Sequence, residues 1–193
     1  MNNILICGLG AIGSNMLVSL SKRYRDAHFT GVDYDKVEDR NIGPQAFFQE
    51  HVGQPKALVM PAILARYSRK VNYTPVNKKL ETPADFGTLI TSKKYDLVLD
   101  CFDNVQARGL VIGEKTLHIG FSPQYTAEII WDRKYSVPGE VDPNRADICV
   151  NPDAAAFIGF VTNFATFVVG EYLDNNFTEK SFIITGKYRI KEI

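Results

Sequence analysis

Three glycines near the start of the chain have the spacing of a phosphate-binding turn. Gly8, Gly10 and Gly13 form the pattern G-x-G-x-x-G, with Ala11 and Ile12 between the last two, directly after a short apolar run. The first glycine permits a tight turn, the second lets backbone N–H groups approach a phosphate, and the third lets a helix pack closely on a strand. Free N–H groups and the helix dipole favour an anion there. The alternative is a glycine turn without a ligand.

An acidic residue follows this turn at the distance expected for contact with a ribose. Asp33 comes 20 residues after Gly13, at the end of the next apolar run. A carboxylate at that place accepts hydrogen bonds from ribose hydroxyl groups. The alternative is a solvated aspartate at the end of a strand. The two features predict a nucleotide ligand without separating NAD, FAD and ATP.

Three polar segments further along the chain carry residues suited to phosphate chemistry. Ammonium and amide groups can neutralise or position phosphate oxygens, and carboxylate oxygens are the ligands that Mg²⁺ prefers. We expect Asp103 just beyond the carboxyl end of a strand, where α/β sheets bind ligands, and Lys56 on the first turn of a helix that reaches the same crevice. The segments contain Asp33, Asp35 and Asn41, then Lys56, then Asp103 and Asn104, with Arg108 four residues later.

Each of these residues also has an ordinary structural explanation. Asp103 could only cap the helix that follows it, and Asn41 could only shape a turn. Lys56 could be a solvated surface lysine. Arg108 could pair with a carboxylate on a helix face, which contributes little when the pair is exposed. The ordered set favours function over these separate explanations.

The elements that would position these residues alternate between strand and helix. Alternating βα units place a parallel sheet between helices, with right-handed crossovers. The sequence therefore predicts a Rossmann-like α/β fold with a mostly parallel sheet and helices on both faces. Apolar runs predict strands at 3–7, 28–32, 71–76, 95–100 and 116–120, and helical spacing predicts helices at 11–24, 54–67, 84–90 and 104–113.

The rest of the chain predicts additional C-terminal strands around one long helix. We expect strands at 126–131, 182–184 and 188–190, an exposed loop at 133–152 and an apolar helix at 154–173. A single domain would then cover 1–193, with a βα core at 1–113 and the C-terminal elements at 114–193.

Composition excludes several classes of function. The net charge is zero at pH 7, which argues against binding to nucleic acid or to an anionic membrane surface. Polar residues interrupt the longest apolar stretch, at 154–169, so a membrane span is not expected. The three cysteines, Cys7, Cys101 and Cys149, form no C-x-x-C pair. We therefore expect no zinc site and no disulfide framework, and a reducing cytoplasm as the location.

Taken together, the glycine turn and the polar segments resemble the ThiF/MoeB family, the adenylating core shared with ubiquitin-activating enzymes. The likeness runs from about Ile4 to Arg108 and continues more faintly to about Leu173. It implies that ATP and Mg²⁺ are used to activate the C-terminal carboxylate of a ubiquitin-like or sulfur-carrier protein, or of a peptide. The products would be an acyl-adenylate and pyrophosphate.

The resemblance also implies roles for individual residues. Asp33 would hold the ribose, with Asp35 and Asn104 in the same nucleotide site. Asn41 would contact the nucleotide or the reacting phosphate, and Lys56 would neutralise the triphosphate. Asp103 would hold Mg²⁺. Arg108 would be a further catalytic residue.

The chain departs from the family pattern at two cations. Pro44 stands where the family has an arginine, directly before Gln45. The N-terminal arm whose arginine reaches the partner subunit in bacterial members is not expected either. Each charge-assisted bond lost from a triphosphate site costs about 1.5–3 kcal/mol. Lys22, Arg23, Arg40 and Arg108 are candidate substitutes.

These departures leave alternatives to an active adenylating enzyme. One is a catalytically degenerate relative that binds a nucleotide or supports an active partner subunit. Another is an NAD-dependent oxidoreductase, which would leave Asn41, Lys56 and Asp103 unexplained. Cys149 could form a thioester, although a cysteine between apolar residues is more often inert. The long helix is apolar on more than one face, which favours a homodimer over a buried intrachain helix.

Overall fold

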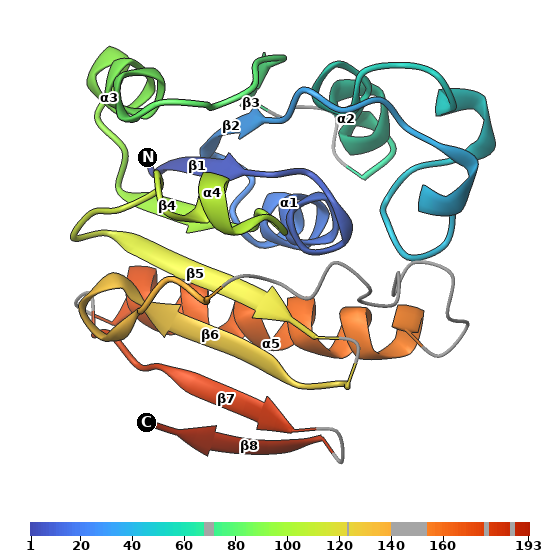
Figure 1. Ribbon diagram of the computed structural model, residues 1–193. Coiled ribbons are helices and arrows are strands. Elements are labelled where there is room, and N and C mark those ends of the chain that lie inside the picture. The colour runs from blue at the N-terminus through green and yellow to red at the C-terminus, as the bar shows by residue number, and fades with distance from the viewer. Residues whose placement is uncertain (68–71, 123, 140–153, 176–177, 186–187) are drawn as a thin grey trace.

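The computed structural model describes residues 1–67, 72–122, 124–139, 154–175, 178–185 and 188–193 (Figure 1). Its described strands form one eight-stranded sheet in the order β3-β2-β1-β4-β5-β6-β7-β8. The strands are β1 Asn3–Cys7, β2 His28–Val32, β3 Asn72–Val76, β4 Leu97–Asp100, β5 Thr116–Phe121, β6 Ala127–Trp131, β7 Phe182–Thr185 and β8 Arg189–Glu192. The helices are α1 Ala11–Arg23, α2 Lys56–Ala65, α3 Pro83–Ser92, α4 Val105–Arg108 and α5 Ala154–Asp174, with short 3₁₀ turns at Asp39–Asn41, Gln49–His51 and Asp132–Lys134.

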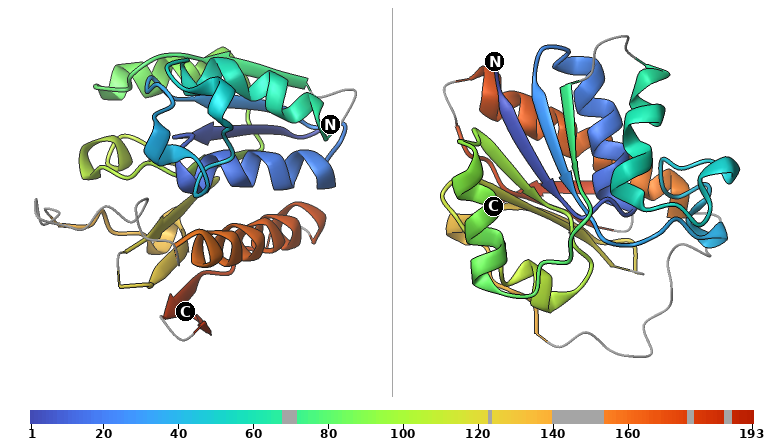
Figure 2. Two further views of the ribbon diagram at one scale, coloured as in Figure 1. Left: turned by 90° about the vertical axis from the view of Figure 1, so that its right-hand side faces the viewer. Right: turned by 90° about the horizontal axis from the view of Figure 1, so that it is seen from above.

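The first five strands in sheet order are parallel, and their side chains alternate between two buried faces. In β1, Ile4 and Ile6 pack into the larger core with α1, α2 and α5, whereas Leu5 and Cys7 face a second core that contains Phe86 of α3. Because both faces are covered at the centre of the sheet, β1 and β4 are largely apolar, whereas the edge strand β3 is mostly exposed. The predicted Rossmann-like sheet with helices on both faces is therefore confirmed (Figure 2).

The carboxyl ends of the parallel strands all lie at one edge of the sheet. The chain leaves β1 through the glycine turn, β2 through Asp33, β4 through the segment with Asp103, and β5 at Phe121. Since β2, β1, β4 and β5 are neighbours in that order, residues from distant parts of the sequence converge there. This convergence creates the candidate site.

Most predicted boundaries are close to the observed ones, with one clear error. The helix expected at 104–113 is only the single turn of α4, which ends at Arg108 with Gly109 as its C-cap. Pro61 lies inside α2, and the helix continues through it from Lys56 to Ala65. The segment 33–55, between β2 and α2, contains two 3₁₀ turns. Most of the loop expected at 133–152 lies outside the described residues, as do residues 186–187 between the last two strands.

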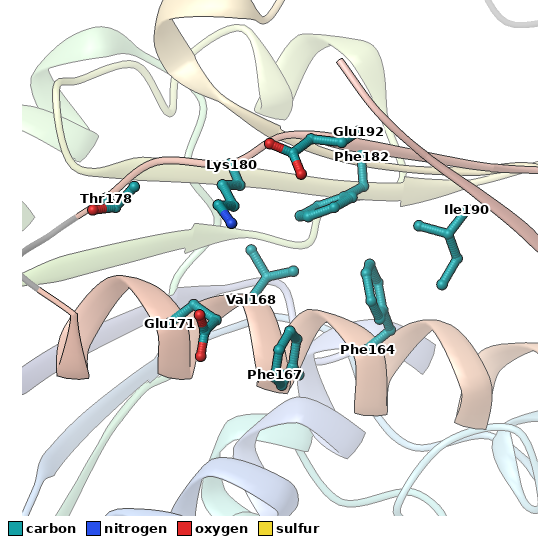
Figure 3. Close-up of a pocket in the computed structure, with 9 residues that line it drawn as sticks. All are labelled: Phe164, Phe167, Val168, Glu171, Thr178, Lys180, Phe182, Ile190 and Glu192. Atoms are coloured by element: carbon teal, nitrogen blue, oxygen red, sulfur yellow. The ribbon is translucent and has the colours of Figure 1, made fainter.

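The antiparallel strands β6, β7 and β8 extend the sheet beside α5, as predicted. Within the described part of the chain, α5 is the one helix whose length and apolar composition would suffice to cross a membrane. Half of its most apolar stretch is buried inside the protein, which is also typical of a core helix. Side by side with α1, it packs on the sheet face (Figure 2). A groove of about 320 Å³ remains between α5 and β7–β8 (Figure 3).

Candidate nucleotide-binding site

A cavity of about 470 Å³ opens at the carboxyl ends of the parallel strands. It collects nearly all of the residues predicted for the site, although they come from five separate segments of the chain. Of those residues, the ones that line it are Gly8, Gly10, Ala11, Ile12, Asp33, Asp35, Asn41, Lys56, Asp103, Asn104 and Arg108. Gly13 is the exception and lies beneath the turn.

The three glycines of the turn have different reasons to lack a side chain. Gly8 has φ +87°, and a Cβ on Gly13 would lie 1.8 Å from the carbonyl oxygen of Gly8. Both are therefore required by the backbone itself. A Cβ on Gly10 would meet no protein atom within 4 Å. Glycine at this position leaves open space beside the cavity, as a phosphate-binding turn requires.

Helix α1 begins at this turn with no side-chain cap. Gly10 is its N-cap, and Ala11 and Ile12 of the first turn line the cavity. The first N–H groups of a helix lack partners within the helix and carry partial positive charge. An anion in the cavity would meet these groups, so the turn fits the phosphates of a nucleotide.

Asp33 is buried and is not the solvated aspartate of the structural alternative. Its exposed fraction is 6%, and its carboxylate accepts hydrogen bonds from the backbone N–H of Leu9 at 2.7 Å and of Asp35 at 2.8 Å. Burial raises the pKa of Asp33 above its ordinary value, although Lys56 and the two N–H donors oppose that rise. Asp33 therefore ties the glycine turn to the end of β2. Its contact with a ribose stays a prediction.

Lys56 is buried at the wall of the cavity, which rules out a solvated surface lysine. Only 8% of its side chain is exposed, and its Nζ lies 3.4 Å from Oδ2 of the half-exposed Asp35. Lys56 is also the first residue of α2. A cation at the positive end of a helix is unfavourable, and burying it costs further free energy. A negatively charged ligand would offset both costs.

Asn41 shapes a turn and also lines the cavity. Its Oδ1 accepts a hydrogen bond from the backbone N–H of Glu38 at 2.9 Å, which closes the 3₁₀ turn Asp39–Asn41. The neighbouring Arg40 lines the same cavity, and its Nε donates to Glu38 at 2.7 Å. The structural explanation for Asn41 is thus correct, and it does not prevent contact with a ligand.

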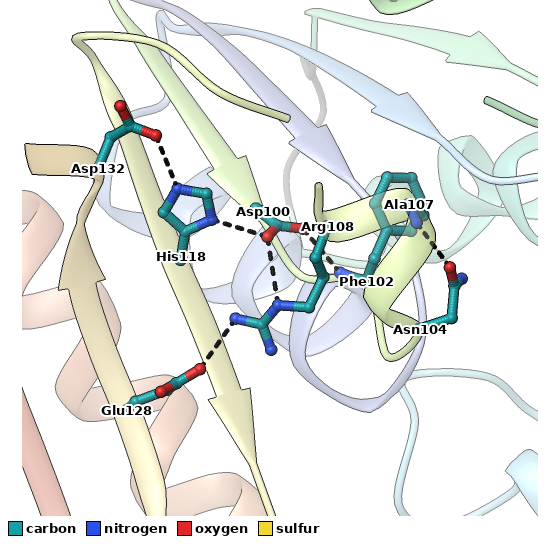
Figure 4. Close-up of polar contacts among 8 residues, drawn as sticks. All are labelled: Asp100, Phe102, Asn104, Ala107, Arg108, His118, Glu128 and Asp132. Atoms are coloured by element: carbon teal, nitrogen blue, oxygen red, sulfur yellow. Dashed lines mark hydrogen bonds and ion pairs between the residues drawn. The ribbon is translucent and has the colours of Figure 1, made fainter. Parts of the chain in front are cut away.

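The structural alternative for Asp103, in which it only caps α4, is wrong. The N-cap is Asn104, whose Oδ1 accepts a hydrogen bond from the backbone N–H of Ala107 at 2.7 Å (Figure 4). Asn104 has the extended backbone of an N-cap, one residue later than expected. Asp103 is exposed and lines the cavity. Its carboxylate is therefore available for a cation.

Arg108 pairs with carboxylates on strands, and not with one on a helix face. Its Nη2 donates to Glu128 of β6 at 3.2 Å, and its Nε lies 3.4 Å from Asp100 of β4 (Figure 4). Asp100 also bonds to His118 of β5. Sequence reasoning missed Asp100, His118 and Glu128. The available signal was an ionisable residue within a strand that is otherwise apolar.

Of the four candidate substitutes for the missing family arginine, the structure places two at the cavity and two away from it. Arg40 and Arg108 line the cavity. Lys22 lies over the ring of Tyr67, and Arg23 pairs with Asp174, so both are engaged elsewhere. Pro44 itself is buried and does not line the cavity.

The two described cysteines are packing residues. Cys7 and Cys101 are buried, and burial raises the pKa of both thiols above the ordinary value. Such thiols are poor nucleophiles. Cys149, the candidate for a thioester, lies outside the described residues.

Comparison with known proteins gives the family. The profile of the ThiF family matches residues 2–114, which is more than half of the chain and includes every predicted site residue. The chain belongs to the ThiF family. The resemblance inferred from the glycine turn and the polar segments is thereby confirmed.

Several curated proteins are similar to the matched part of this ThiF-family chain. Molybdopterin-synthase adenylyltransferase of Escherichia coli (strain K12) is 36% identical over 111 residues, which is 55% of this chain and 42% of that protein. Ubiquitin-like modifier-activating enzyme 5 of Dictyostelium discoideum is 30% identical over 129 residues, 62% of this chain and 33% of that protein. The chain thus spans less than half the length of these relatives.

Solved structures with the same fold extend over the whole chain. E. coli MccB with ATP superposes with a TM-score of 0.74 at 15% identity, covering 100% of this chain and 63% of that one. PaaA gives a TM-score of 0.70 at 17% identity, covering 100% of this chain and 72% of that one. These similarities confirm the fold of this ThiF-family chain.

Proposed function

We propose that the chain binds ATP with Mg²⁺ and transfers AMP to the C-terminal carboxylate of a ubiquitin-like or sulfur-carrier protein, or of a peptide. The observation that carries the proposal is the buried Lys56, which lines the same cavity as the glycine turn and Asp103. The relatives named as adenylyltransferases or activating enzymes, and MccB crystallised with ATP, support the same chemistry.

In this proposal the chain's own groups place the nucleotide across the sheet edge. The Asp33 carboxylate accepts from the ribose hydroxyls at the end of β2. The N–H groups at the start of α1 hold phosphate oxygens, while Lys56 and Arg40 neutralise the leaving pyrophosphate. Asp103 holds Mg²⁺, which when bound supplies positive charge to the phosphate oxygens.

The proposed reaction needs little proton transfer. A carboxylate oxygen of the substrate attacks the α-phosphorus, a new O–P bond forms, and the bond to the departing pyrophosphate breaks. The substrate carboxylate is already ionised at neutral pH, so no general base is required. Positioning and neutralisation of charge therefore carry the catalysis, and the cations that line the cavity are suited to that task.

The decisive variant is Lys56→Met, tested against Lys36→Met. Lys36 is an exposed lysine that does not line the cavity. We expect Lys56→Met to weaken ATP–Mg²⁺ binding, measured by calorimetry, by about 10-fold or more, because a charge-assisted contact is worth about 1.5–3 kcal/mol. Lys36→Met should bind like the wild type. Equal affinity of both variants would contradict the role of Lys56.

Catalysis is tested separately, by exchange of labelled pyrophosphate into ATP. The assay contains the wild-type chain, ATP, Mg²⁺ and a carrier protein or peptide with a free C-terminal carboxylate. Carboxylate-dependent exchange would support adenylation. Tight ATP binding without exchange for any carrier would favour the second candidate, a degenerate nucleotide-binding partner subunit. Pro44, buried where the family has an arginine, is the observation behind that candidate.

A further inference from the structure

Five ionisable side chains gather beside the cavity, between β4, α4, β5 and β6 (Figure 4). Asp100 and His118 are fully buried, and their neighbours are partly or largely buried. Burying charged groups costs free energy even when they are paired. An arrangement of this kind therefore calls for a reason beyond packing. Its members are Asp100, Arg108, His118, Glu128 and Asp132.

Both oxygens of the Asp100 carboxylate have hydrogen-bond partners other than Arg108. Its Oδ1 accepts from the backbone N–H of Phe102 at 3.2 Å, and its Oδ2 bonds to Nδ1 of His118 at 2.8 Å. Nε of Arg108 lies 3.4 Å from the same Oδ2, is buried and has no hydrogen-bond partner. A free carboxylate would form two parallel hydrogen bonds with a guanidinium group. Here Asp100 and Arg108 have only the long contact of 3.4 Å between Oδ2 and Nε.

His118 is fixed in the orientation that keeps Asp100 engaged. Its Nε2 lies 3.1 Å from Oδ1 of Asp132, so its two ring nitrogens face two carboxylates. The ring of Tyr135 stacks on it with 3.6 Å between centroids and 7° between planes. The imidazole itself is fully buried and does not line the cavity. His118 can therefore act on a ligand only through Asp100 and Arg108.

The guanidinium of Arg108 reaches the cavity wall at Gly120. A Cβ on Gly120 would lie 2.4 Å from Nη1 of Arg108, and both residues line the cavity. Glu128 accepts from Nη2. Nη1 thus lies against the backbone of Gly120, where a side chain would leave it no room, in the wall of the cavity where the proposed reactants bind.

We propose that His118 is a positioning residue: it holds Asp100 away from a bidentate pair with Arg108, and so leaves the positive charge of the guanidinium for a phosphate oxygen of the nucleotide. This inference rests on the proposed function, because it assumes that a nucleotide occupies the cavity. Without the His118 donor, Asp100 would turn to Arg108 and neutralise it.

The test compares two conservative variants of His118 by calorimetry with ATP–Mg²⁺. In His118→Asn the amide nitrogen takes the place of Nδ1 and still donates to Asp100, whereas in His118→Gln the amide reaches the place of Nε2 and Asp132. We expect His118→Asn to bind within about twofold of the wild type. His118→Gln should lose about 10-fold, as Arg108→Met does. The double variant Arg108→Met/His118→Gln should bind no more weakly than Arg108→Met.

A second buried histidine provides the matched control for general destabilisation. His51 is buried, accepts a hydrogen bond from the backbone N–H of Phe48 and does not line the cavity. His51→Gln should leave nucleotide affinity unchanged, with thermal unfolding measured for every variant. Equal affinity of His118→Asn and His118→Gln, or an Arg108→Met variant that binds like the wild type, would overturn the proposal.

Titration with AMP locates the phosphate. The same loss with AMP and with ATP assigns the contact to the α-phosphate, and a loss confined to ATP assigns it to the β- or γ-phosphate; either supports the proposal.

Failure of this inference about His118 is distinct from failure of the proposed function. A wild type that binds ATP and shows no exchange refutes adenylation alone, whereas normal exchange with equal His118 variants refutes this inference alone. A wild type that binds no nucleotide refutes both.

Discussion

Two side chains of the cavity, Lys56 and Asp33, are ionisable and buried, which costs free energy. Lys56 is buried at the positive end of α2, with Asp35 at 3.4 Å as the carboxylate beside it. Asp33 is buried with a raised pKa, which means that its charged form is disfavoured where it lies. Strained electrostatics of this kind cluster at functional sites. A bound nucleotide would bring phosphate charge to Lys56 and ribose hydroxyl donors to Asp33.

Asp103 and Asn104 are adjacent, but we expect their substitution to change different properties: Mg²⁺-dependent ATP binding for Asp103 and stability for Asn104. Asn104→Ala removes the cap of α4 and should cost about 1 kcal/mol of unfolding free energy, measured by urea denaturation. Asp103→Asn should leave that free energy unchanged, because Asp103 is exposed and does not cap the helix. Calorimetry should instead show that Mg²⁺ no longer strengthens ATP binding. A loss of stability in Asp103→Asn as large as in Asn104→Ala would make Asp103 a structural residue.

At the scale of elements, the sequence predicts what depends on local pattern. The strand, glycine turn and helix around Gly8 follow from apolar runs and from backbone geometry, and the structure has them at the expected residues. The length of α4 was overestimated, because the apolar residues that follow Gly109 pack without continuing the helix. The cap of α4 is Asn104, one residue after Asp103, which the sequence offered as the alternative cap.

Contacts between distant elements could not be predicted in this way. The pairing of Arg108 with Glu128, and of His118 with Asp100 and Asp132, depends on β6 returning antiparallel beside β5. The spacing of residues in the sequence does not show in which register β6 pairs with β5. The site residues from parallel strand ends were predictable because parallel strands share one edge, a rule that applies without knowing the register.

Helix α3 carries a pH-dependent cap that can be measured. Asp85 accepts hydrogen bonds from Lys78, from the hydroxyl of Thr82 and from the backbone N–H groups of Glu81 and Thr82, and these hold its pKa well below the ordinary value. A lowered pKa means that the ionised form stabilises the folded state. The contribution is complete above the unfolded-state pKa of about 3.9 and is lost as pH falls toward the lowered value.

Asp85→Asn should therefore lower the thermal unfolding midpoint at pH 6, and its difference from the wild type should shrink as the pH is lowered from 4 to 2. Exposed Glu114, outside this cap, provides the control as Glu114→Gln. A difference between Asp85→Asn and wild type that stays constant over this range would show that the charge of Asp85 does not stabilise the cap.

At the scale of the whole molecule, the sheet has two parts with different surroundings. The central parallel strands are covered on both faces and end at the cavity, whereas β6 and β7 pack on α5, and β7 and β8 border the groove in Figure 3. Apolar side chains that line this groove remain open to solvent: half of Phe167 and 42% of Ile190 are exposed. Contiguous exposed apolar surface of this kind marks an interaction site.

We expect a second copy of the chain to cover this surface, in line with the homodimer proposed from the apolar character of α5. Light scattering after gel filtration at micromolar concentration should give twice the chain mass of 21.6 kDa for the wild type. Phe167→Glu, which places a charge among the apolar side chains of the groove, should give the mass of one chain. Ile112→Glu changes an equally exposed apolar residue that does not line the groove, and should leave the mass unchanged. Burying one charge without a partner in the interface costs several kcal/mol. A Phe167→Glu variant that stays dimeric would therefore place the interface elsewhere. A wild type that is monomeric at these concentrations would contradict the dimer itself.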